Sequence, residues 1–239
     1  EELTSLEDTL ELLSDPDAMH QLDESRQAYA AGDFVTGDEL RVVATDGHRL
    51  AYANEKLSKS LPRTEVILPR KTVLELSRLL EDNDEELDIR LSQNQAVFRF
   101  GDIELVSKLI DGKFPDYERV IPQGHNKVIT VPRTVLLQSL HRAAILTNEK
   151  FRGVRVVLAA GSLKIISSNS DQEEAQEELE VSYDAEALDI GFNVTYLLDV
   201  LNNVSNEEVE IRLADANSSA LITLPGNDSF KYVVMPMRI

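Results

Sequence analysis

The chain has 239 residues, 42% of them hydrophobic and 28% charged, which is enough for one large or two medium domains with real cores. It has no cysteine, which excludes disulfides and thiolate chemistry, and no apolar run approaches the roughly 20 residues that span a membrane. The net charge of −19 argues against phosphate binding, but residues 1–38 hold eleven acidic residues and one basic residue, so the acidity is concentrated at the front.

The first 38 residues are predicted to form a helical, acidic segment. A leucine stripe predicts one helix over about 5–14, and Asp15 and Pro16 end it and begin a second helix, which runs to about Ala31 before Gly32. The stretch Ser5–Ala18, followed by Tyr29–Asp33, resembles the toxin-neutralising part of YefM/Phd/RelB-type antitoxins. This resemblance implies a second possible function, in which residues 1–38 neutralise a RelE-like toxin.

Three later segments share one plan: a short apolar strand, a turn and an amphipathic helix. They cover residues 66–80, 128–142 and 190–204. Pro69 and Pro132 are 63 residues apart, and the equivalent Phe192 follows 60 residues later, which indicates a repeated supersecondary unit. In the first helix, Val73, Leu76 and Leu80 are expected to form the buried stripe.

Short alternating or apolar runs between these helices predict strands, with turn signals such as Asp111-Gly112 and Gly161-Ser162 separating them. We expect strands over 87–91, 95–100, 104–110, 154–158, 163–166, 209–213, 220–224 and 231–235. The acidic run 173–178 is predicted to be a solvated strand edge or helix face. The fold class is therefore predicted to be α+β, built from repeated β-α-β-β-β units.

Five longer motifs carry a resemblance to a known family. They are Ala44–Ala51 (ATDGHRLA), Ser107–Val120, Ala143–Arg155, Gly191–Leu201 and Tyr232–Ile239. Together they resemble the second and third domains of the bacterial DNA polymerase III β subunit, the sliding clamp, over about residues 39–239. The resemblance implies the clamp fold, with a partial central domain over 39–122 and a C-terminal domain over 123–239. It leaves open a second role for the helix over 5–14, which would replace a helix missing from the central domain.

The resemblance also implies a function without chemistry of its own. A clamp is a cytoplasmic processivity factor that encircles duplex DNA without sequence specificity. It serves as a docking platform in DNA replication and repair for the DNA polymerase III catalytic subunit, the clamp loader and other proteins with a clamp-binding motif. No membrane, cofactor or metal is implied.

Residue by residue, the resemblance implies three sets of functional positions. The peptide-binding cleft is expected to comprise Thr45, Gly47, His48, Arg49, Leu50, Pro115, Arg119, Val120, Asn193, Tyr196, Val233, Val234, Met235, Pro236, Met237 and Arg238. The candidates for the side that faces DNA are Arg70, Lys71, Arg133 and Lys150. Ile145 and Leu146 match the apolar part of the ring interface.

The chemistry of the residues supports a cleft beside the C-terminus. Methionine adapts to several partners, so Met235 and Met237 are suited to an apolar anchor pocket, while Arg49 and Arg238 are suited to hold the polar groups of a peptide. The alternative interpretation is that residues 232–237 are simply a buried edge strand.

Catalytic and metal sites have no support in the sequence. Asp46 and His48 lie two residues apart, but no Gly-x-Ser-x-Gly motif accompanies them, and the four histidines lack metal-ligand spacing. A glycine-rich phosphate loop is also missing. We therefore expect a binding protein rather than an enzyme.

Overall fold

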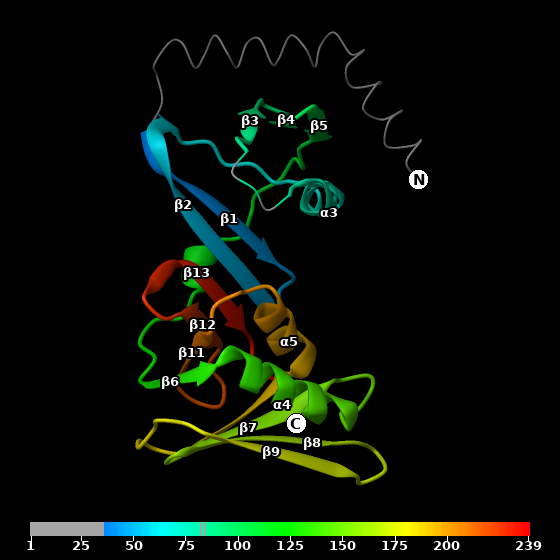
Figure 1. Cartoon of the computed structure of the whole chain (residues 1–239), viewed down its shortest axis with the longest axis vertical. Helices are drawn as coiled ribbons and strands as arrows, with labels where there is room; N and C mark the ends of the chain where they lie inside the picture. Colours follow the sequence, from blue (N-terminus) through cyan, green and yellow to red (C-terminus); the bar gives the residue numbers. More distant parts are fainter. Residues whose placement is uncertain (1–35, 82, 84) are drawn as a thin grey trace. The chain divides into compact units, whose positions relative to one another are not determined.

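The computed structural model describes residues 36–81, 83 and 85–239, drawn in colour in Figure 1. The helices predicted over 5–14 and 16–31 lie outside the described residues. The chain divides into two compact units. Of the described residues, the first combines 36–38 with Leu57–Pro115, and the second combines Glu39–Lys56 with Asp116–Ile239.

The second unit contains the predicted β-α-β-β-β repeat twice. The first copy is β6 (Lys127–Pro132), α4 (Arg133–Ile145), β7 (Gly153–Ala159), β8 (Ser162–Ser168) and β9 (Glu174–Glu180). The second copy is β10 (Leu188–Asn193), α5 (Val194–Asn202), β11 (Glu208–Leu213), β12 (Ala220–Leu224) and β13 (Asn227–Val234). This confirms the predicted repeat in this unit, and the acidic run 173–178 lies largely in β9 at the edge of its sheet. The strand predicted at the start of segment 66–80, in the first unit, is not formed, because residues 63–69 belong to no strand.

The two copies exchange their first strands. β10 pairs with β7 in the four-stranded sheet β10-β7-β8-β9, and β6 pairs with β11 in the six-stranded sheet β1-β2-β13-β12-β11-β6. Because each sheet holds a strand from the other copy, neither repeat can complete its sheet alone. The helices α4 and α5 contact each other and cover the core between them and the sheets (Figure 1).

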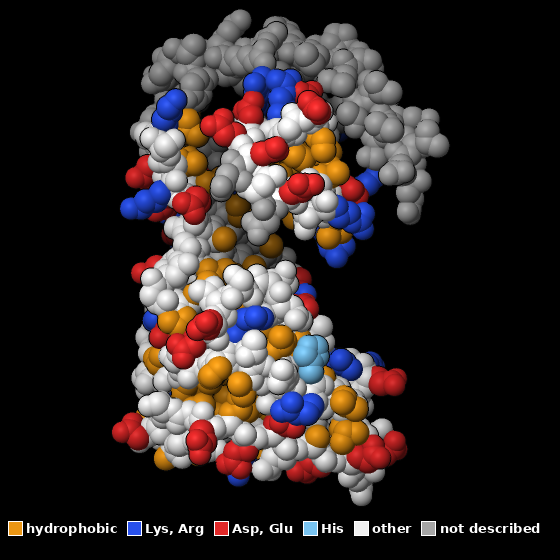
Figure 2. Space-filling view, in the orientation of Figure 1, with side chains coloured by type: hydrophobic (Ala, Val, Ile, Leu, Met, Phe, Trp, Pro, Cys, Tyr) orange, Lys and Arg blue, Asp and Glu red, His pale blue; other side chains and the backbone are white. Residues whose placement is uncertain are grey.

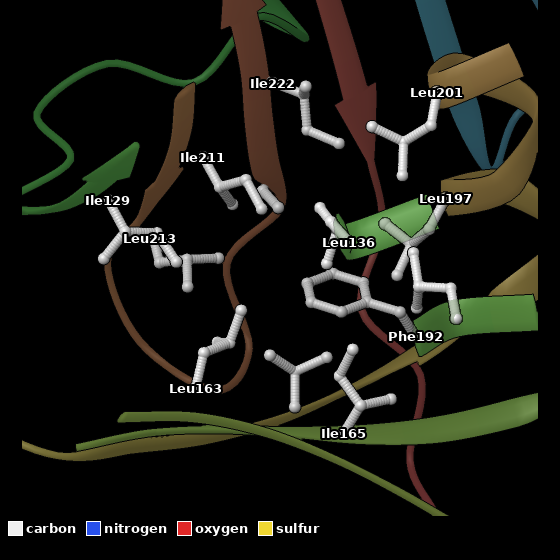
Figure 3. Close-up of a pocket in the computed structure, with 13 residues that line it drawn as sticks. Ile129, Leu136, Leu163, Ile165, Phe192, Leu197, Leu201, Ile211, Leu213 and Ile222 are labelled. Carbon is white, nitrogen blue, oxygen red and sulfur yellow. The ribbon is translucent and has the colours of Figure 1, made fainter. Parts of the chain in front are cut away.

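The core of this unit is aliphatic and closely packed. Leu140, Leu158, Leu163, Ile165 and Leu201 are at most 1% exposed, and each contributes about 1.5–3 kcal/mol through burial. A cavity of about 30 Å³ remains among them, and Figure 3 shows side chains from both sheets and both helices pointing into it. Its lining is entirely apolar, so a water molecule there would find no hydrogen-bond partner.

A long hairpin of β1 (Thr36–Thr45) and β2 (Arg49–Pro62) extends the six-stranded sheet. β2 pairs antiparallel with β13, and Leu50 lies opposite Val233. β13 therefore lies between β2 and β12, and the interpretation of residues 232–237 as an edge strand is wrong. The strand β2 was not predicted, because its alternation of apolar and polar residues breaks at a polar run around Asn54, Glu55 and Lys56.

The first unit packs α3 (Arg70–Leu79) with the three-stranded sheet of β3 (Asp88–Leu91), β4 (Gln95–Phe100) and β5 (Ile103–Lys108). Its core contains Leu76, Ala96, Phe98 and Phe100. The predicted α3 stripe is correct only at Leu76, because Val73 is 50% and Leu80 39% exposed.

The buried face of α3 includes Thr72 in place of Val73. The Thr72 hydroxyl lies 2.6 Å from that of Ser107, which satisfies both buried groups. Thr72 and Leu76 are four residues apart and share a helix face, whereas Val73 is rotated away from it by about 100°.

Candidate functional site

The turn that joins β1 to β2 is held by its own side chains. The Asp46 carboxylate accepts hydrogen bonds from the backbone N–H groups of His48 (3.0 Å) and Arg49 (3.1 Å), and the Thr45 hydroxyl donates to the Arg49 carbonyl (2.7 Å). Gly47 has φ +87°, a conformation that L side chains rarely adopt. The turn therefore presents His48 and Arg49 in a fixed geometry.

The same contacts exclude the Asp46–His48 dyad. The Asp46 carboxylate bonds to backbone N–H groups and to the Arg49 guanidinium, and no bond to the His48 ring is found among the described residues. Burial raises the pKa of Asp46, but these hydrogen bonds outweigh it and hold the pKa below its ordinary value. A carboxylate committed in this way is a structural element of the turn.

Arg49 ties the turn to α5 and β13. Its guanidinium donates to Asp46 (3.0 Å), to Asp199 and to the Tyr232 hydroxyl (3.2 Å), and lies 4.5 Å from the centre of the Tyr196 ring. Burial opposes the charged form, yet these bonds outweigh it and raise the pKa of Arg49 above its ordinary value. Arg49 therefore uses much of its donor capacity within the protein.

The C-terminal residues lie against this turn. The Met235 N–H donates to the His48 carbonyl (2.9 Å), and the Met237 N–H donates to the Gly191 carbonyl (2.9 Å). A side chain on Gly191 would overlap the Met237 carbonyl oxygen, so β10 admits the C-terminal residues only because this position is glycine. The structure thus joins the two predicted stretches, one early and one at the C-terminus.

An apolar floor lies beside these residues. Leu50 and Val233, each 1% exposed, form a cluster with Tyr52 and Leu221, and Tyr117 packs against it. Met235 is 47% exposed. We call this region, from the Leu50–Val233 floor to the Thr45–Leu50 turn and the residues 235–238, the docking groove, after the peptide-binding cleft that the sequence resemblance implied there.

The predicted cleft residues take different places around the docking groove. His48 stacks on Tyr196, with ring centres 6.4 Å apart, and Asn193 caps α5 by accepting a bond from the Thr195 N–H (2.9 Å). Val234 is fully buried and packs in the main core, so it supports the groove from behind and does not line it. Pro115 is the last residue of the first unit and stays a prediction.

The remaining predicted cleft residues are exposed to differing degrees. Arg119 follows Tyr117 in the 3-10 helix and pairs with Asp116 (2.8 Å), and its side chain is 87% exposed. Val120 is 46% exposed, Pro236 is half-buried and Arg238 is exposed. Exposed groups of this kind are available to a ligand.

Sequence reasoning missed three residues that define this site. Tyr52 and Leu221 complete the floor, and Asp199 binds Arg49. Tyr52 could have been found, because it shares a strand face with Leu50 two residues earlier. Asp199 carried no local signal, since its partner lies 150 residues away in the chain.

The predicted DNA-facing residues also differ in their contacts. Arg133 donates to the carbonyl oxygens of Leu201 (2.9 Å) and Asn206 (3.0 Å), so it satisfies backbone groups at and beyond the end of α5. Arg70, Lys71 and Lys150 are exposed. In Figure 2, acidic and basic side chains are interspersed on the face in view.

The predicted ring-interface residues lie at the end of α4. Ile145 is 77% exposed, and Leu146 is half-buried. Within residues 36–81, 83 and 85–239, no group of three or more His, Asp or Glu side chains could hold a metal ion. No helix in the same part of the chain is long and apolar enough to cross a membrane.

Comparisons with known proteins identify relatives over most of the chain. Residues 32–116 match the family described as "DNA polymerase III beta subunit, central domain", and residues 118–238 match "DNA polymerase III beta subunit, C-terminal domain". The chain is 50% identical over 210 residues to a β sliding clamp of Pseudomonas putida, covering 86% of this chain and 56% of the relative. It therefore spans a little over half of the length of such relatives.

Solved structures agree with these matches. The structure is similar to the Pseudomonas aeruginosa sliding clamp bound to griselimycin, with TM-score 0.81 and 50% identity, over 86% of this chain and 56% of that one. It is also similar to the Caulobacter crescentus β sliding clamp with PEG bound to its putative β-motif tethering region, with TM-score 0.80 and 39% identity, over 86% and 56% of the two chains. These likenesses confirm the α+β clamp fold.

The antitoxin resemblance gains no support from these comparisons. It falls on residues 1–38, of which 1–35 lie outside the described residues, and the relatives named above are all sliding clamps. The division of the clamp-like part into domains 39–122 and 123–239 stays a prediction.

Proposed function

Because the chain belongs to the family of the bacterial DNA polymerase III β subunit, we propose that it is a sliding-clamp polypeptide that tethers replication proteins to DNA by docking their short peptides. In this function the chain has no catalytic role and needs no cofactor. It works in the cytoplasm, where DNA is replicated.

The docking part of the proposal rests on one observation: backbone hydrogen bonds attach the C-terminal residues to the β1–β2 turn and to β10. Met235 bonds to His48 of the β1–β2 turn, and Met237 bonds to Gly191 of β10. These bonds hold the C-terminal residues, which carry two flexible methionine side chains, against the β1–β2 turn and β10. A preformed apolar floor with an adaptable rim suits short peptides from several partners.

The polar rim of the docking groove gives the peptide its orientation. His48 and Tyr196 offer a stacked aromatic surface, and Arg238 is exposed. Arg49 acts mainly by holding this rim in place, since its bonds to Asp46, Asp199 and Tyr232 occupy its Nε and Nη1 donors. Clamp-binding peptides of the polymerase III catalytic subunit and the clamp loader are the proposed ligands. The griselimycin and PEG complexes of the relatives support the presence of a ligand site in this family.

The DNA part of the proposal rests on the family and on exposed basic residues. We assign Arg70, Lys71 and Lys150 to the side that faces duplex DNA, with Arg133 in a structural role, and Ile145 and Leu146 to contact with another subunit. A ring would hold DNA by topology. Retention on nicked circular plasmid DNA, lost when the plasmid is linearised, is the expected result, and equal retention on both forms would contradict encirclement.

The docking function is tested with a fluorescently labelled clamp-binding peptide of a polymerase III catalytic subunit. We expect saturable binding by fluorescence anisotropy and its loss when residues 235–239 are deleted. Substitution of Lys164 by Met, on the separate four-stranded sheet, is the matched control and should leave the affinity unchanged.

The melting temperature of each variant separates a lost groove from a lost fold. Unchanged peptide affinity after deletion of residues 235–239 would contradict the docking function. If the deletion variant does not fold, the peptide affinity of Gly191→Ala is measured instead. This substitution is designed to displace the same residues while the chain keeps its full length.

A further inference from the structure

A second hollow opens on the same unit as the docking groove. It has a volume of about 290 Å³, and its lining includes Arg41, Tyr52, Tyr117, Glu118, Gln123 and Lys231. We call it the Tyr52 pocket. None of these residues belongs to the cleft that the sequence resemblance implied, and only the two tyrosines contribute to the apolar floor of the groove.

Two hydrogen-bond donors in the Tyr52 pocket lack an acceptor. Tyr52 is only 7% exposed, and its hydroxyl makes no hydrogen bond with any residue that the structure describes. Lys231 lies opposite Tyr52 on the neighbouring strand, with its Nζ 5.3 Å from the Tyr52 ring, and pairs with no carboxylate in the described part of the chain. Lys231 is half-buried and the Tyr52 hydroxyl still reaches solvent, so both groups are free to donate to an acceptor that a ligand brings into the pocket.

The state of Tyr52 suits it to donate. Burial is the main cause that raises the pKa of Tyr52 above its ordinary value, although the nearby Arg41 charge lowers it. The hydroxyl therefore keeps its proton at neutral pH. It can offer that proton to an anionic acceptor.

Arg41 supplies a third donor at the wall of the pocket. Its guanidinium pairs with Glu39 (2.9 Å) and Glu118 (3.2 Å) and reaches the Tyr117 hydroxyl (3.4 Å). The Glu118 side chain is 69% exposed, and ion pairs at this level of exposure are weak. A ligand carboxylate can therefore take the place of Glu118 on Arg41.

The charged side chains around the Tyr52 pocket favour an anion with a single negative charge. Lys231 provides one positive charge without a partner, while Glu39 and Glu118 already balance Arg41. A single negative charge is matched by Lys231, whereas a phosphate dianion would meet repulsion from both glutamates. A planar carboxylate with two acceptor oxygens fits this set of donors.

The Tyr52 pocket shares Tyr52, Tyr117 and Ile121 with the cluster that forms the floor of the docking groove. Leu50 and Val233 form the floor as opposite residues, and Tyr52 and Lys231 are the next pair on the same face of the two strands. Two residues of strand correspond to about 7 Å, which an extended peptide covers with about two residues. A peptide anchored on the floor thus brings a neighbouring side chain to the pocket.

We propose that the Tyr52 pocket binds the carboxylate of an acidic side chain in the docked peptide, about two to four residues from its apolar anchor. This inference rests on the proposed docking function and adds a preference that the apolar floor alone does not provide. Partners with an acidic residue at that spacing bind more tightly than partners with a neutral one.

The test compares clamp-binding peptides that differ by one residue. Each peptide carries Glu or Gln at one position, two, three or four residues to either side of the apolar anchor, and its affinity is measured by fluorescence anisotropy. At one of these positions we expect the Glu peptide to bind about three to ten times more tightly than its Gln counterpart, as for a partly exposed charge-assisted hydrogen bond. The gain should shrink at high salt.

Two substitutions assign the gain to the pocket. Lys231→Met keeps the aliphatic stem and removes the charge, and Tyr52→Phe removes only the hydroxyl. Each should reduce the preference for Glu to less than about twofold. Lys231→Met should also leave the affinity for the Gln peptide unchanged, whereas Tyr52→Phe is judged by the ratio of the two affinities, because Tyr52 belongs to the groove floor. Lys164→Met is again the matched control and should preserve the full preference, because Lys164 pairs with Glu178 on the other sheet. Should Tyr52→Phe fail to fold, Lys231→Met decides alone.

The outcomes separate this inference from the docking function. Tight binding of the Gln peptides with no gain from Glu at any position, or a gain that survives Lys231→Met, overturns the carboxylate pocket and leaves docking intact. If no peptide binds the unmodified chain, the docking function fails, and the pocket inference fails with it.

Discussion

Gly191→Ala is the substitution that most directly tests how the docking groove is built. A Cβ at this position would overlap the Met237 carbonyl oxygen and lie 2.8 Å from the Ile239 side chain. The first of these contacts is with backbone, so a side-chain rotation cannot relieve it. Because Gly191 does not have a positive φ, alanine suits the local backbone of β10. The expected effect is therefore displacement of the C-terminal residues, not strain in the strand.

The size of this effect follows from the contacts that hold the C-terminal residues. The hydrogen bond from Met237 to Gly191 contributes about 1 kcal/mol. Ile239 is 61% exposed, so its partial burial adds about 1 kcal/mol at most. Losing about 2 kcal/mol shifts the equilibrium toward displaced residues roughly thirtyfold. The backbone overlap adds to this loss and makes the intact groove the minor state, so the apparent Kd for a peptide that needs it should rise about tenfold to thirtyfold.

Peptide anisotropy and hydrogen exchange provide the assay. Gly191→Ala should weaken peptide binding about tenfold to thirtyfold and accelerate amide exchange at Met237, while the melting temperature falls by about 4–8 °C, as expected for about 2 kcal/mol in a chain of this size. Gly153→Ala is the matched control. Its Cβ would lie 3.3 Å from Ile239 Cδ1 and 3.6 Å from Met237 Cε, which are mobile ends of side chains. We expect less than about a threefold change in its affinity.

Two results would refute this reasoning. One is a Gly191→Ala chain that binds the peptide as tightly as the original chain. The other is an equal loss of affinity in Gly191→Ala and Gly153→Ala, since the backbone overlap is specific to Gly191.

The remaining predictions concern the turn and the core. Arg49→Lys keeps the charge but loses the planar guanidinium that bonds Asp199, so the free energy of unfolding in urea should fall by about 1–2 kcal/mol. An unchanged free energy of unfolding would show that these hydrogen bonds do not stabilise the fold. Folding lowers the pKa of Asp46. Its contribution to the free energy of unfolding is therefore complete above its unfolded pKa of about 4 and disappears as the pH falls through the pKa of the folded state. The difference in melting temperature between the original chain and Asp46→Asn should therefore stay constant from about pH 7 to 5 and shrink toward pH 3, and a difference independent of pH would contradict this. Leu163→Ala, at a 1% exposed position lining the core cavity, should cost about 3–5 kcal/mol in urea unfolding, whereas Val128→Ala, 41% exposed, should cost less than about 1 kcal/mol. Equal costs would mean that the cavity region is loosely packed.

Local patterns predicted the secondary structure well where a short apolar run forms a buried strand. The strands β4 and β12 have the predicted bounds, Gln95–Phe100 and Ala220–Leu224. The stripe on α3 was wrong at Val73 because the sheet covers the face of Thr72 and Leu76, a choice that depends on packing. The strand β2 was missed because it carries polar residues along much of its length.

By itself, the sequence determined the repeated β-α-β-β-β units, the α+β class and the motifs shared with sliding clamps, since these depend on residue spacing within short stretches. Tertiary structure alone decided that β13 lies beside β2, that Arg49 is bonded to Asp199, and that Tyr52 and Lys231 share a pocket. The physical reason is that strand order and register join residues more than 100 positions apart, and they are set by burial of whole sheet faces. No local pattern encodes which strand will be the neighbour.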